Sequence, residues 1–258
     1  METLSALTYL VAAALFILGL KYMSSPATAR KGNLMAAIGM LLAIVVTLLD
    51  QQIVSFTWII IGMILGSIIG ALAARMVKMT AMPEMVGIFN GFGGGASALV
   101  AIAEFYYLTS TGTLPIDTGI TIMLSVIIGG VTFTGSLIAF GKLNGSISGS
   151  PITFPAQNIV NLLVLIAAVV LGGIISVGLG SPILFYVVIG LSLLYGVLFV
   201  IPIGGADMPV VVSLLNSFSG LAACAAGFVV DNNVLIISGS LVGSAGLILT
   251  QIMCKAMN

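Results

Sequence analysis

Apolar segments about as long as a membrane span recur along the whole chain, with short polar stretches between them. A helix needs about 20 mostly apolar residues to cross a bilayer, because each residue adds about 1.5 Å to its length. Nine segments meet this requirement, namely 3–20, 34–49, 53–74, 82–103, 119–141, 158–177, 182–200, 208–229 and 233–252. The pattern therefore predicts an all-α fold, a polytopic transmembrane helical bundle of about nine spans.

The positions of the charged residues indicate how this bundle crosses the membrane. With nine spans, all seven basic residues fall on the same side: Lys21, Arg30, Lys31, Arg75, Lys78, Lys142 and Lys255. Connectors on the cytoplasmic side are enriched in Lys and Arg. We therefore expect a multi-pass protein with its N-terminus outside and its C-terminus in the cytoplasm.

Composition narrows the possible functions. Hydrophobic residues make up 60% of the chain and charged residues only 5%, against roughly 25% charged residues in an average soluble domain. Seven basic and seven acidic residues cancel, which removes the general attraction for nucleic acid. The chain has no histidine and only two cysteines, Cys224 and Cys254, so we expect no metal site and no histidine acid or base. The expected surroundings are the lipid bilayer.

Two stretches of the chain match at an offset of 126 residues. Residues 82–98 and 208–224 are identical at seven of 17 positions, and both begin with Met-Pro. Because four spans separate the two starts, both helices run in the same direction, which predicts a parallel internal repeat. Repeats often frame the transport site of a transporter, and the alternative is a duplicated packing helix without a transport role.

Both repeated helices carry an asparagine near their middle. Asn90 and Asn216 lie eight residues after the opening methionine, roughly 12 Å into a hydrocarbon core about 30 Å thick. On the fifth span, Thr132 and Ser136 are four residues apart and share a face. These groups can join helices by hydrogen bonds or line a water-filled path, and the sequence leaves both open. Since no Asp, Glu or His lies at this depth, protons would cross on water held by amides and hydroxyls.

An acidic residue accompanies the proline at each of these helix starts. Glu84 follows Pro83, and Asp207 stands two residues before Pro209. Each carboxylate can favour the positive end of its helix dipole, and capping alone explains both. A role in proton entry is an additional hypothesis.

Glycines at four-residue spacing predict faces on which helices approach closely. The run 93–95 next to Asn90 either loosens its helix or packs against a neighbour. The spaced glycines are Gly62, Gly66 and Gly70, then Gly91 and Gly95, and then Gly239 and Gly243.

Several motifs together resemble the membrane domain of the proton-translocating NAD(P) transhydrogenase beta subunit. They are Lys-Tyr-Met-Ser-Ser-Pro-Ala-Thr-Ala-Arg-Lys-Gly-Asn at 21–33, Met-Thr-Ala-Met-Pro-Glu at 79–84, Val-Thr-Phe-Thr-Gly-Ser at 131–136 with Ala-Phe-Gly-Lys-Leu at 139–143, Gly-Ala-Asp-Met-Pro-Val-Val-Val at 205–212 with Asn-Ser at 216–217, and Ile-Met-Cys-Lys-Ala-Met-Asn at 252–258. They cover the chain from its first connector to its last residue, so the resemblance is specific.

The resemblance implies an enzyme complex that couples hydride transfer between NAD(H) and NADP(H) to proton movement across a bacterial inner membrane. Residues 1–258 correspond to the proton-translocating domain, which holds no cofactor and no hydride-transfer site. The resemblance places NAD(H) in an alpha subunit that contributes further spans. It places NADP(H) in a domain of the beta subunit expected after residue 258, and it implies a homodimer of the complex.

The resemblance also assigns roles to single residues. Asn90 stands where some members carry a histidine in the proton path, and Ser136 and Asn216 match other positions linked to that path. Asp207 matches an acid at the cytoplasmic mouth. Thr132 and Glu84 complete the candidate path, and the candidates for coupling and packing are Lys142, Gly239, Gly243 and Gly246.

Two other functions remain open from the residues alone. A secondary transporter for a small solute would use the two Asn-bearing helices as its binding site. A structural scaffold that anchors soluble subunits would keep a dry interior at Asn90 and would move no protons.

Overall fold

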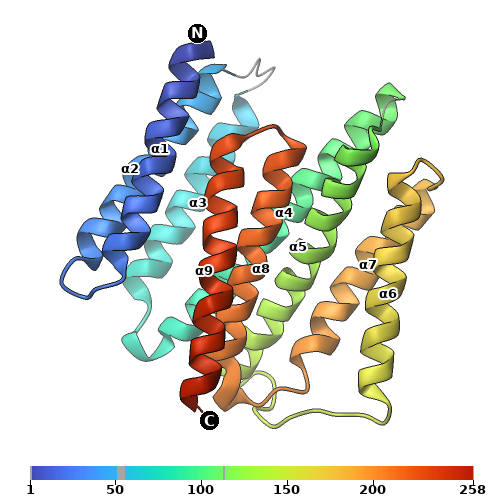
Figure 1. Ribbon diagram of the computed structural model, residues 1–258. Coiled ribbons are helices and arrows are strands. Elements are labelled where there is room, and N and C mark those ends of the chain that lie inside the picture. The colour runs from blue at the N-terminus through green and yellow to red at the C-terminus, as the bar shows by residue number, and fades with distance from the viewer. Residues whose placement is uncertain (1, 51–55, 113, 258) are drawn as a thin grey trace. The chain divides into compact units, whose positions relative to one another are not determined.

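The computed structural model describes residues 2–50, 56–112 and 114–257, and within these ranges the chain forms nine α-helices and two short 3₁₀ helices (Figure 1). All nine α-helices are long and apolar enough to span a membrane, which confirms the predicted fold class. They are α1 (Glu2–Met23), α2 (Ala29–Asp50), α3 (Thr57–Met76), α4 (Met82–Thr111), α5 (Ile116–Leu143), α6 (Gln157–Ser176), α7 (Pro182–Val200), α8 (Met208–Val229) and α9 (Asn233–Met257). The 3₁₀ helices η1 (Met79–Ala81) and η2 (Gly205–Asp207) directly precede α4 and α8.

Several helices extend beyond the apolar segments that predicted them. The bounds of α7 and α8 agree with the prediction, whereas α4 continues from the expected end at residue 103 to Thr111. Gly112 then ends α4 in the left-handed region, with φ 77°, where a residue without a side chain is favoured. Hydropathy marks only the part of a helix that lies in hydrocarbon, whereas backbone hydrogen bonding continues until a capping residue stops it. The predicted start of the third span, 53–55, lies outside the described residues.

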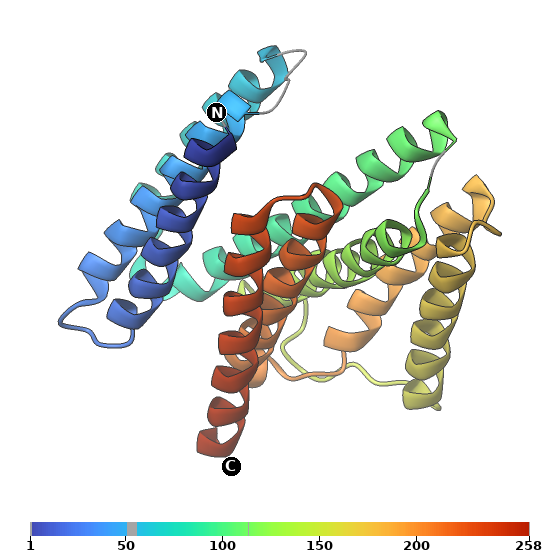
Figure 2. The ribbon, with the colours of Figure 1, turned by 45° about the horizontal axis from the view of Figure 1, so that its top comes forward.

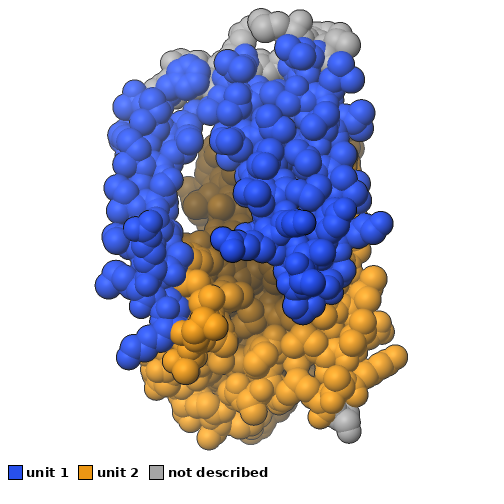
Figure 3. Space-filling view, turned by 90° about the vertical axis from the view of Figure 1, so that its left-hand side faces the viewer, with its two compact units in different colours: residues 1–78 blue, residues 79–258 orange. Residues whose placement is uncertain are grey.

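The chain divides into two compact units, 1–78 and 79–258, which Figure 3 shows in separate colours. In the first unit α1 and α2 pack so closely that a Cβ on Gly32 would lie 2.6 Å from the Gly19 carbonyl oxygen. A Cβ on Gly62, Gly66 or Gly70 of α3 would meet nothing within 4 Å. Among the described residues of the first unit, the α3 glycine face thus lacks the close contact that its spacing predicts.

The second unit is arranged around α5, which contacts α4, α6, α7 and α8 (Figures 1 and 2). Side chains from α4, α5, α6, α7 and the end of α8 form one apolar core that includes a stacked pair, Phe105 and Phe185, with ring centroids 3.9 Å apart. A second core lies around Met208 and Leu215, where α8 begins beside the ends of α5 and α7. Both helices with a Met-Pro start, α4 and α8, contact α5 and each other, so the interface of these three helices is where the candidate residues can meet.

Candidate functional site

Three polar side chains join α4, α5 and α8 by hydrogen bonds. Asn90 on α4 is only 9% exposed, and its Nδ2 donates to the Ser136 Oγ on α5 at 2.9 Å. On α8 the Ser219 Oγ donates to the Asn90 Oδ1 at 2.8 Å. Ser136 is fully buried. We refer to Asn90, Ser136 and Ser219 as the Asn90 cluster.

The local sequence of α4 brings its backbone close enough to α5 for these short side chains to meet. Gly87, Gly91 and Gly94 are buried at spacings of four and three residues, so they share one face of the helix. A Cβ on Gly91 would lie 3.1 Å from the Ser136 Cβ. Larger residues on this face would hold the helices apart and would separate Asn90 from Ser136.

One helical turn from the cluster, α4 and α5 touch through their backbones. A Cβ on Gly94 would lie 2.7 Å from the Thr132 Cβ, and a Cβ on Gly129 would lie 2.5 Å from the Gly94 carbonyl oxygen. The buried Thr132 hydroxyl donates to the Ile128 carbonyl of its own helix at 2.7 Å. Thr132 therefore contributes tight packing beside the cluster, and its hydroxyl is already engaged. The glycine run 93–95 leaves α4 helical throughout.

The structure does not bring Asn216 into the cluster. Asn216 lies at an exposed position of α8, although the internal match aligns it with Asn90. Ser219, three residues later, supplies the contact from α8 instead. The sequence did not indicate Ser219, because serine is common in apolar helices and the internal match pairs Asn90 with Asn216 instead. Its position on the same helical face as Asn216, within three residues, was the available signal.

The two acidic candidates lie where their helices begin. Glu84 is half-buried in the first turn of α4, and Asp207 is exposed as the last residue of η2. The Asp207 side chain forms no capping hydrogen bond to α8. Its carboxylate remains close to the positive end of the α8 dipole, which favours a negative charge there.

The remaining candidates are buried at helix contacts. Lys142 is 4% exposed at the end of α5 and donates hydrogen bonds to backbone carbonyls. Gly239, Gly243 and Gly246 lie on the face of α9 that packs on α8, and a Cβ on Gly246 would lie 2.9 Å from the Ser217 Cβ. Ser217 in turn donates to the Gly243 carbonyl. These glycines permit close packing of α9 on α8, and their role in coupling stays a prediction.

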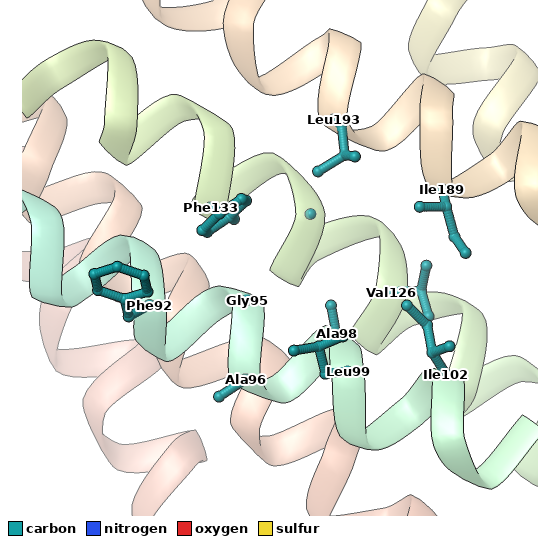
Figure 4. A pocket seen from close by; sticks show the side chains of 11 residues that line it. Phe92, Gly95, Ala96, Ala98, Leu99, Ile102, Val126, Phe133, Ile189 and Leu193 are labelled. Atoms are coloured by element: carbon teal, nitrogen blue, oxygen red, sulfur yellow. The ribbon is translucent and has the colours of Figure 1, made fainter. Parts of the chain in front are cut away.

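A hollow of about 510 Å³ lies between α4, α5 and α7, close to the cluster (Figure 4). Its lining includes Phe92, Leu99, Phe133 and Leu193, and every lining residue is apolar or glycine. The hollow therefore offers no hydrogen-bonding side chain to a proton, an ion or a polar solute. In the part of the chain that the structure describes, no three His, Cys, Asp or Glu side chains gather as metal ligands do.

Comparison with known proteins identifies the family. The family model described as NAD(P) transhydrogenase beta subunit matches residues 5–258. Two curated relatives, both named NAD(P) transhydrogenase subunit beta and both from Rhodospirillum rubrum, are each 43% identical to the chain over 262 residues. The alignment covers 100% of this chain and 56% of each relative, so the chain spans about half of their length. The chain belongs to the NAD(P) transhydrogenase beta subunit family.

Proposed function

We propose that this chain is the membrane domain of a proton-translocating NAD(P) transhydrogenase. It conducts protons across the bilayer while a hydride passes between NAD(H) and NADP(H) in separate soluble domains. The family match and the nine apolar helices support this assignment. The observation that carries the proton path is the Asn90 cluster, in which two buried polar side chains, Asn90 and Ser136, and the half-buried Ser219 are hydrogen-bonded across three spanning helices.

The chemistry of the cluster suits a relay that holds water. An amide and a hydroxyl can each donate and accept a hydrogen bond, so either can orient water in both directions along a chain. Neither titrates near neutral pH, and the proton would therefore move along bound water without resting on a side chain. In the structure Asn90 is bonded to Ser136 and Ser219. Conduction thus requires a second state, in which water replaces one of these bonds and which bound nucleotides favour differently.

The proposed surroundings follow the family. An alpha subunit supplies the NAD(H) domain and further spans, and NADP(H) binds a domain of the beta subunit beyond residue 258. The complex is a homodimer in a bacterial inner membrane. Glu84, Asp207 and Lys142 lie at the cytoplasmic ends of their helices, with the N-terminus outside. Asn216 is exposed on this chain. A span of the alpha subunit packs against it, and Asn216 then forms part of the proton path.

A secondary transporter, the alternative open from the residues alone, is not favoured by the family match. The apolar hollow also lacks the polar groups that would bind a small polar solute.

The test uses the complete enzyme reconstituted in vesicles, with Asn90→Leu. We expect proton movement linked to nucleotide turnover to be lost, while hydride transfer between the soluble domains persists. Asn161→Leu is the matched control, because Asn161 on α6 is a partly buried asparagine that donates to the Leu198 carbonyl at 3.3 Å outside the cluster. Unchanged pumping in Asn90→Leu, or equal loss in both variants, would refute the proposed path.

A further inference from the structure

The Lys142 ammonium is buried at the end of α5 and is surrounded by backbone oxygens. Its Nζ lies 2.6 Å from the Ile201 carbonyl, 2.7 Å from the Ile203 carbonyl and 3.2 Å from the Ser150 carbonyl. An ammonium has three donors, so these three acceptors use all of them. Burying a charge is costly unless it is fully hydrogen-bonded, and Lys142 meets that condition with main-chain oxygens alone.

The three carbonyls belong to two different connectors. Ile201 and Ile203 lie in the α7–α8 connector, residues 201–207, which follows the end of α7 and includes η2. Ser150 lies in the α5–α6 loop, residues 144–156. Carbonyls at the C-terminal end of a helix carry a partial negative charge, and a cation there is stabilised. Lys142 thus holds the end of α7 and the α5–α6 loop together.

Backbone hydrogen bonds join the same two connectors on either side of the ammonium. The Ile152 N–H donates to the Ile201 carbonyl at 3.2 Å, and the Gly205 N–H donates to the Gly149 carbonyl at 2.8 Å. Gly205 is the first residue of η2, and the next helix begins three residues later at the fully buried Met208. The position of the α8 start is therefore set by contacts that meet at Lys142.

We infer that Lys142 is a positioning residue for the proton path. It fixes the start of α8, and with it Asp207, against the end of α5. Ser136 lies six residues before Lys142 on α5, and Ser219 lies on the helix whose start the connector fixes. Holding these two ends together keeps the two serines at the distance that Asn90 bridges. The inference deepens the proposed function and rests on it.

The first test is Lys142→Met in the complete enzyme, reconstituted in vesicles. Methionine keeps the length and apolar stem but removes all three donors. Losing one hydrogen bond to a charged group changes an equilibrium constant by roughly tenfold or more. We therefore expect the protons moved per hydride transferred to fall by a similar factor. An unchanged ratio would overturn the inference.

A cross-link then separates positioning from direct chemistry of the ammonium. A Cβ on Gly205 would lie 3.3 Å from the Gly149 Cα, and both glycines have backbone conformations open to other residues. Gly149→Cys with Gly205→Cys can therefore join the connectors without Lys142, in a background where the free Cys224 and Cys254 are replaced by serine. We expect the oxidised pair to restore the ratio in Lys142→Met, and reduction to abolish the rescue. The Gly149→Cys variant alone is the control and should restore nothing.

Each other outcome has a defined meaning. Failure of the cross-link to restore the ratio overturns positioning, because the ammonium would then act by its charge. If Lys142→Met does not accumulate in the membrane, recovery of accumulation by the oxidised pair supports the inference, and absence of recovery overturns it. If Lys142→Met lowers the protons moved per hydride transferred while Asn90→Leu pumps normally, the proton path through Asn90 is refuted. The inference that Lys142 positions that path is then overturned with it.

Discussion

Asn90 and Asn216 occupy matching positions in two helices that begin with the same Met-Pro pair, yet their surroundings differ. Asn90 is buried and bonded to side chains of two other helices, whereas Asn216 lies at an exposed position of α8. Each helix even begins after a 3₁₀ turn of three residues. The local sequence therefore sets how far along its helix each asparagine lies, and the neighbouring helices set what the side chain contacts.

The difference has a simple packing origin. On α4 the glycines at 87, 91 and 94 let α5 approach on the face that carries Asn90. On α8 the buried glycines, Gly220 and Gly227, face α9. Asn216 is left exposed. A polar residue in a membrane helix thus acquires its role from the face on which small residues admit a neighbour.

The largest expected effect concerns the packing that creates this asymmetry. Gly94→Ala places a methyl group 2.7 Å from the Thr132 Cβ, and we expect a loss of about 1–3 kcal/mol of unfolding free energy from overpacking. Gly93→Ala is the control, because a Cβ there meets nothing within 4 Å. Unfolding in mixed detergent micelles measures both. Equal stability of the two variants would contradict the close contact of α4 with α5.

A smaller effect is expected from Asn90→Leu. The variant removes the bonds to Ser136 and Ser219, and polar bonds between membrane helices average about 0.6 kcal/mol each, so we expect a loss of about 1 kcal/mol. The same unfolding assay detects it. A variant as stable as the unmodified protein would show that Asn90 is not bonded as described.

Ser219→Ala removes only the hydrogen bond from α8. We expect a loss of about 0.6 kcal/mol, and a reduced ratio of protons moved to hydride transferred in the complete enzyme. Ser244→Ala is the matched control, because the Ser244 hydroxyl is exposed and bonds only to α9 itself. Normal pumping in Ser219→Ala would show that proton movement does not need the hydrogen bond from α8.

The smallest effect on stability is expected at Asn216. Asn216→Leu exposes an apolar side chain where an exposed amide was, and we expect a change within about 0.5 kcal/mol. In the complete enzyme the same variant should lose linked pumping, since we propose that a span of the alpha subunit covers this side chain. Full pumping would exclude Asn216 from the path, and a large loss of stability would show that the chain itself buries it.

The sequence predicted the fold well, because nine apolar segments and the one-sided basic residues leave few alternatives. It also indicated that Asn90 and Ser136 are polar groups at similar depth in apolar helices, and it left open whether they bond to each other or line a water-filled path. It could not predict that Ser219 would replace Asn216, because the rotation of α8 about its axis depends on how Gly220 and Gly243 pack at the α8–α9 contact. Nor could it show that Lys142 is buried, since a basic residue at a helix end usually lies at the membrane surface.

The central claim is that Asn90 and Ser136 act as one unit in moving protons. A double-mutant cycle tests it directly, with linked proton movement measured for Asn90→Leu, Ser136→Ala and the double variant in the complete enzyme. The account predicts that each single variant loses most of the pumping and that the double variant is no worse than Asn90→Leu alone. Independent, multiplying losses, or full pumping in either single variant, would contradict it.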